Sequence, residues 1–122
     1  MRYMMLLKLD PATAASAASG GGPSEELMTE MGKLIDEMTK AGVLLDTGGL
    51  RPVEEATVLR LAGGRQTVVD GPFAEAKEVV GGYCIVQAKS IDEAVEWTSR
   101  FLAIHGDEWD LVAEVRQIEE PE

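Results

Sequence analysis

Two amphipathic helical segments, each lying between short apolar runs, constrain the fold of this chain more than any other feature of its sequence. In residues 24–41, apolar side chains recur at the spacing of one helical face: Leu27, Met31, Leu34, Ile35 and Met38. Ser24 is suited to cap this helix and Gly42 to end it. We therefore expect a helix that packs its methionine-rich stripe against a sheet.

The second helical segment opens with a capping box, in which a serine is followed three residues later by a glutamate. Ser90 and Glu93 take these two positions, and the helix is expected to reach about Ile104. Its predicted buried face consists of Ile91, Ala94, Val95, Trp97, Phe101 and Leu102.

Short apolar runs predict the strands. They cover residues 3–9, 43–50, 57–61, 66–69, 83–89 and 111–118. The pair Gly63-Gly64 lies between the third and fourth runs, which predicts a β-hairpin. The order of elements predicts an α+β fold on the ferredoxin-like βαββαβ plan, with the hairpin inserted and both helices on one face of an antiparallel sheet.

Such a plan leaves the other face of the sheet without helices. On that face we expect Met4, Leu6, Tyr83 and Ile85 among charged residues. An apolar patch of this kind is an association surface. The sequence therefore predicts a C2 homodimer in which two sheets pack face to face.

Length and charge limit the classes of function. The 122 residues are one domain, and 11 basic against 22 acidic residues give a net charge of −11. Nucleic acid and anionic membranes are poor partners for such a chain. No apolar run is long enough to span a membrane and no signal-peptide cleavage site is evident, so we expect a cytoplasmic protein. With one cysteine and one histidine, an internal disulfide and a Cys/His zinc site are excluded, and the residues demand no cofactor.

A stretch rich in alanine, serine and glycine interrupts the domain after the first strand. Residues 10–23, and above all 12–23, carry no large side chain and are expected to form a flexible loop. Loops of this length are either mobile insertions or functional lids, and both interpretations stay open.

The densest group of chemically active residues follows the hairpin. Asp70 begins a run, Asp70-Gly71-Pro72-Phe73-Ala74-Glu75-Ala76-Lys77-Glu78, in which three carboxylates and one ammonium lie within nine residues. A helical turn would place Glu75 and Glu78 on one face, as an acid/base pair needs. We take Asp70, Glu75 and Glu78 as candidate catalytic residues; the alternative is an acidic turn with weak surface ion pairs.

Other polar residues are candidates for substrate binding. Arg116 shares a face of the last strand with Glu114, so it either binds an anionic substrate or forms a structural ion pair. Lys77 and Tyr83, which lies just after the run, complete this group. Cys84 is expected to be a small buried side chain rather than a thiolate, and His105 to cap the end of the second helix.

The run from Asp70 to Glu78, with Gly81-Gly82-Tyr83 after it, resembles the signature of the YCII-related, or DGPF-domain, family. Weaker similarities extend over the chain, in Tyr3–Leu7, Ala41–Leu45 with Gly49–Pro52, Ile91–Trp97 and Glu114–Arg116. The resemblance implies a dimeric α/β-barrel related in fold to muconolactone isomerase. It also implies a bacterial protein, in some cases associated with extracytoplasmic-function sigma factors.

The resemblance is weaker at one functional position. A better-known branch of the family is thought to pair a histidine of the first helix with an aspartate, but here residues 25–41 contain no histidine. Asp70 is the residue that matches the motif. Two hypotheses follow: an enzyme acting on a small organic molecule by acid/base chemistry, or a non-catalytic ligand-binding or regulatory dimer.

Overall fold

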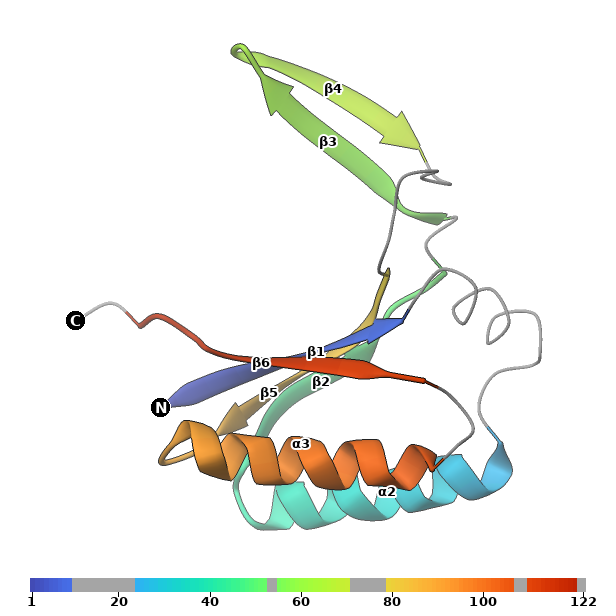
Figure 1. Ribbon diagram of the computed structural model, residues 1–122, viewed down its shortest axis with the longest axis vertical. Coiled ribbons are helices and arrows are strands. Elements are labelled where there is room, and N and C mark those ends of the chain that lie inside the picture. The colour runs from blue at the N-terminus through green and yellow to red at the C-terminus, as the bar shows by residue number, and fades with distance from the viewer. Residues whose placement is uncertain (10–23, 53–54, 71–78, 107–109, 121–122) are drawn as a thin grey trace.

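A four-stranded antiparallel sheet with helices on one face forms the body of the protein in a computed structural model (Figure 1). The structure describes residues 1–9, 24–52, 55–70, 79–106 and 110–120. The sheet has the order β2-β5-β1-β6 and consists of β1 (Arg2–Leu9), β2 (Leu44–Gly49), β5 (Val79–Gln87) and β6 (Val112–Gln117). The helices are α2 (Glu25–Lys40) and α3 (Ile91–His105), and a separate hairpin is formed by β3 (Thr57–Ala62) and β4 (Arg65–Asp70).

The prediction of an α+β fold is confirmed, and the strand order is consistent with the ferredoxin-like plan. The predicted loop over residues 10–23 lies outside the described residues.

Helix α2 forms where its caps and apolar stripe predict it. The Ser24 side chain accepts a hydrogen bond from the Leu27 backbone N–H at 3.1 Å, which satisfies one of the free donors of the first turn. Leu27, Leu34 and Met38 are buried. After the helix, Gly42 has a φ of +73°, a left-handed conformation that ends helices at little cost only for glycine.

Helix α3 is capped as predicted, and its buried face is in part the predicted one. The Ser90 side chain accepts a hydrogen bond from the Glu93 N–H at 3.3 Å. Of the predicted residues, Ala94 is buried and Trp97 and Phe101 pack against the core, whereas Ile91 and Val95 are exposed. Thr98 and His105 are also buried in this helix. Thr98 tolerates burial because its hydroxyl donates to the Ala94 carbonyl at 2.8 Å. Thr98 and His105 are polar, so hydrophobic periodicity did not assign them to this face.

The hydrophobic core lies between the helices and the inner face of the sheet. It contains Tyr3, Met5, Leu34, Met38, Val43, Val86, Ala88 and Ala94. Arg100 of α3 forms an ion pair with Glu37 of α2, and its guanidinium lies 5.1 Å from the centre of the Trp97 ring. The alternating partners of the core residues, which include Met4, Leu6 and Ile85, lie on the opposite face of the sheet, which we call the outer face.

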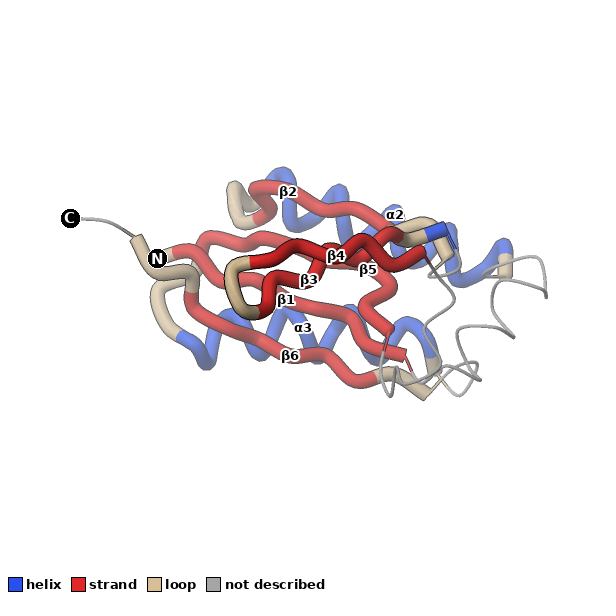
Figure 2. Tube along the Cα trace, turned by 90° about the horizontal axis from the view of Figure 1, so that it is seen from above, coloured by secondary structure: helices blue, strands red, loops and turns tan. Residues whose placement is uncertain are grey.

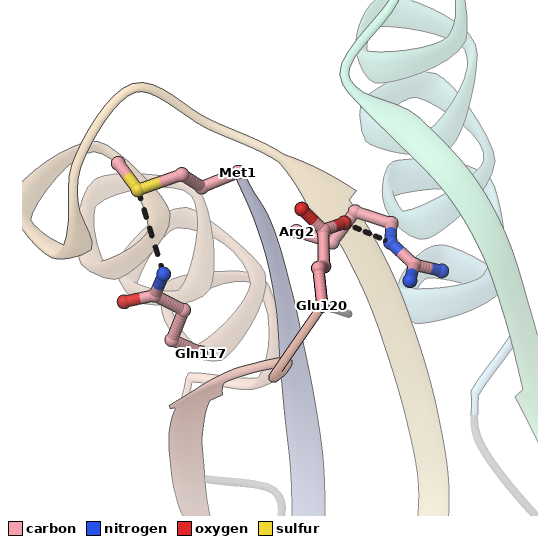
Figure 3. Close-up of polar contacts among 4 residues, drawn as sticks. All are labelled: Met1, Arg2, Gln117 and Glu120. Carbon is pink, nitrogen blue, oxygen red and sulfur yellow. Dashed lines mark hydrogen bonds and ion pairs between the residues drawn. The ribbon is translucent and has the colours of Figure 1, made fainter. Parts of the chain in front are cut away.

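The two ends of the described chain meet beside the sheet. Figure 3 shows the Gln117 amide donating to the Met1 sulfur at 3.5 Å and Arg2 paired with Glu120, with Nε and Oε1 2.5 Å apart. The backbone N–H of Ile118 also donates to the Arg2 carbonyl at 2.8 Å. These contacts hold the segment after β6 against the start of β1.

The predicted hairpin is present, but it stands apart from the four-stranded sheet. In Figure 1 it lies on the side away from the helices, and in the view of Figure 2 it overlies the middle strands. Gly63 and Gly64 form its turn with φ values of +58° and +78°. Two successive residues with positive φ define the tight turn that suits the twist of a hairpin, and glycine adopts them without strain.

A close backbone approach between β5 and β2 gives a test of this packing. A Cβ atom on Gly82 would lie 3.0 Å from the Gly48 carbonyl oxygen, whereas a Cβ on the opposite residue, Gly49, would meet nothing within 4 Å. We expect Gly82→Ala to lower the free energy of unfolding by about 1–2 kcal/mol because the backbone must shift. Gly49→Ala is the matched control and should leave stability unchanged or slightly raised. Urea unfolding of both variants measures the difference, and equal stabilities would contradict the packing described.

Candidate functional site

Strand register arranges the outer face of the sheet in two rows. One row crosses all four strands as Asp46, Ile85, Met4 and Arg116. The next row consists of Gly48, Tyr83, Leu6 and Glu114. Directly opposed residues share a face, so the face has a polar group at each edge and apolar side chains in the middle. The prediction that Met4, Leu6, Tyr83 and Ile85 lie together on the face without helices is confirmed.

Tyr83 and Asp46 form the polar pair at the β2 edge. The Tyr83 hydroxyl donates to Asp46 Oδ2 at 3.3 Å. The negative charge of Asp46 raises the pKa of Tyr83, with smaller contributions from desolvation and from this hydrogen bond. Gly48 makes the arrangement possible, because a Cβ at that position would lie 3.0 Å from the Tyr83 ring. Tyr83 therefore stays a neutral hydrogen-bond donor at physiological pH.

Lys8, Glu114 and Arg116 form the polar group at the β6 edge. Lys8 Nζ lies 2.8 Å from Glu114 Oε1, and Arg116 Nε lies 3.6 Å from Glu114 Oε2. The hydrogen bond from Lys8 is the main reason why the pKa of Glu114 is lowered. The Arg116 side chain is 72% exposed, so most of its guanidinium remains accessible to an anion. The structure therefore shows an ion pair of Arg116 with Glu114, and binding of an anionic substrate by Arg116 stays a prediction.

Cys84 packs against the core on the inner face of the sheet, and His105 is buried at the end of α3, so neither lies on the outer face. Burial is the largest of the effects that raise the pKa of Cys84 to about 11, which keeps its sulfur a neutral thiol. His105 is buried at the end of α3, and its Nδ1 lies 3.0 Å from the Phe101 carbonyl oxygen, in the last turn of the helix. These positions agree with the structural roles expected for both side chains.

Comparison with known proteins places this sequence in a family. A family model described as the YCII-related domain matches residues 1–107. The chain belongs to the YCII-related domain family. The YCII-related chain is also 34% identical over 73 residues to an uncharacterised protein of Rhizobium meliloti (strain 1021). That match covers 60% of the chain and 59% of the relative, so the chain spans less than two thirds of the curated relative's length.

The described residues of the YCII-related chain contain part of the predicted site. Asp70 is the last residue of β4 and its backbone is paired with Thr57, while its side chain is not among those described. Glu75, Lys77 and Glu78 lie outside the described residues. Tyr83 and Arg116 lie on the same outer face, separated by β1. Their assignment to substrate binding stays a prediction.

Sequence reasoning missed Asp46. Its relation to Tyr83 depends on the pairing of β2 with β5, and that register shifts by one residue between Leu44 and Asp46. A shift of one residue moves a side chain to the other face of a sheet, so alternation along β2 could not have assigned Asp46 correctly. The alternation of side chains along β5 placed Tyr83 on the outer face, and this was the one feature of the sequence that pointed towards the pair.

The described residues contain no cluster of three or more His, Cys, Asp and Glu side chains arranged to hold a metal ion. Within the same ranges, neither helix has the length and apolar character that crossing a membrane requires.

The Tyr83–Asp46 pair predicts a measurable titration. We expect Asp46→Asn to lower the pKa of Tyr83 towards its ordinary value of 10.0, because the neighbouring negative charge is removed. Absorbance of the tyrosinate, followed against pH in a Tyr3→Phe background, reports this one phenol. Asp110→Asn, at an exposed aspartate just before β6, is the control and should leave the titration unchanged. An unchanged titration in Asp46→Asn would contradict the pair.

Proposed function

We propose that the YCII-related chain is a cytoplasmic homodimer that binds a small organic anion on the outer face of its sheet and acts on it by acid/base chemistry. The observation that carries the proposal is the composition of that face. Half-buried Met4, Leu6 and Ile85 lie between the Tyr83–Asp46 pair and Arg116. Small-molecule sites are mostly apolar surfaces with a few well-placed polar groups.

A second copy of the chain would turn this open face into an enclosed site. A single sheet with helices on one side leaves its other face open to solvent, and two such faces packed together exclude water. The barrel expected from the family resemblance has this form. Electrostatic interactions with a bound anion become stronger when water is excluded.

The proposed chemistry assigns a role to each candidate. Arg116 and Lys77 would orient the anionic group of the ligand through charge-assisted hydrogen bonds. Tyr83, held neutral by Asp46, would donate a hydrogen bond. Asp70 would be the general acid or base, assisted by Glu75 and Glu78. Proton transfer, isomerisation or elimination by these groups would require no cofactor.

The alternative is a dimer that binds a ligand without catalysis. The ion pairs of Glu114 with Lys8 and Arg116 favour it, because paired charges stabilise the face without any reaction. In this case the run from Asp70 to Glu78 would be structural, and the protein would act as a regulatory partner, for example in a sigma-factor system.

A substitution that introduces a charge at the centre of the outer face tests the proposed homodimer. We expect Ile85→Lys to raise the dissociation constant of the homodimer by roughly 100-fold, because an unpaired ammonium would be buried between the sheets. Ile85 is outside the core of the protomer, so the fold should be retained. Val95→Lys, at an exposed position of α3, is the matched control. Sedimentation equilibrium measures both, and a wild-type monomer at every concentration would overturn the dimer.

Acid/base chemistry is tested by isotope exchange. With small aromatic and aliphatic carboxylates in deuterated buffer, we expect the wild type to promote deuterium incorporation at carbon, observed by proton NMR. Asp70→Asn should reduce this exchange by at least about 100-fold while ligand-detected binding persists. Asp110→Asn is the control for loss of one charge. Binding without exchange in the wild type would favour the non-catalytic alternative.

A further inference from the structure

The β3–β4 hairpin carries an apolar face that the described part of the protomer leaves in solvent. Leu59 and Val68 oppose each other across the two strands, and Leu61 is on the same face two residues along β3. These three side chains are 63%, 62% and 70% exposed. Adjacent apolar side chains at this exposure are typical of an interaction surface rather than of an isolated surface residue.

Among the described residues, nothing gives the hairpin the support that two strands need. Its two strands form a sheet of their own, separate from the four-stranded sheet. An isolated two-stranded hairpin is marginally stable in water and needs further strands or a packed face. Figure 1 shows that the helices, on the far side of the main sheet, do not supply this packing.

Charge indicates what kind of surface the hairpin would meet. Residues 57–70 contain Arg60 and Arg65 against one acid, Asp70, for a net charge of +1. The remainder of the chain therefore carries −12. Two such acidic bodies repel each other, while a weakly basic hairpin is attracted to the body of another copy.

From these observations we infer that the β3–β4 hairpin is a dimerisation arm, which packs Leu59, Leu61 and Val68 against the outer face of a second copy of this chain. The apolar side chains it would meet there are those of Met4, Leu6 and Ile85. The inference rests on the proposed homodimer and adds that each protomer contributes a segment to the face where the other binds its ligand.

The arm is tested by a paired substitution that keeps strand propensity. Leu59→Thr with Val68→Thr removes two of the three apolar side chains and places β-branched residues, which favour strands, at both positions. We expect the dissociation constant of the homodimer to rise roughly 10-fold or more. Met28→Thr with Val95→Thr, at exposed apolar positions of the two helices, is the matched control and should leave it unchanged. Sedimentation equilibrium measures both variants in the chain of 122 residues.

Hydrogen exchange separates this inference from the dimer itself. In the wild type, amides of residues 57–70 should be protected at concentrations where the dimer forms and exchange freely on dilution to the monomer. The arm is ruled out if the paired substitution leaves the dissociation constant of the dimer unchanged and residues 57–70 exchange equally in the monomer and the dimer. The proposed homodimer would not be affected by this result. If the wild type is a monomer at every concentration, both proposals are wrong. This holds whether the amides of the hairpin exchange freely or are protected because the hairpin packs on its own sheet.

Discussion

One-sided helical cover of the sheet is the constraint on which the rest of this structure depends. Helices α2 and α3 bury the inner residues of β1 and β5, including Tyr3, Met5 and Val86. Strands alternate their side chains between two faces, so the same strands must present Met4, Leu6 and Ile85 on the other side. The apolar outer face therefore follows directly from the way in which the core is built.

Strand pairing, rather than proximity in sequence, assembles the polar groups on that face. Asp46 and Tyr83 are 37 residues apart along the chain, and Lys8 and Glu114 are 106 apart. Both pairs form because β5 and β6 flank β1, and β2 flanks β5. A rigid sheet holds such pairs with little freedom, which suits a site that must present fixed donors and charges to a small ligand.

The sequence predicted those features that depend on local patterns. Caps at Ser24 and Ser90, the Gly63-Gly64 turn and the family motif from Asp70 to Glu78 all involve neighbours in the chain. Features that depend on distant partners were not predictable in the same way. Thr98 enters the core because its hydroxyl is satisfied within the helix, and Asp46 reaches Tyr83 through a register shift in β2. Hydrophobic periodicity contains neither piece of information.

The position of β1 in the sheet also has a consequence for folding. Strand β1 is the first element of the chain, yet its two neighbours are β5 and β6, which come from residues 79–87 and 112–117. Contacts between segments so distant in sequence slow folding, because a long loop must close before any pairing stabilises it. During synthesis the first strand must wait without a partner until nearly the whole domain has left the ribosome. During this time the apolar side chains of β1 are exposed to chaperones.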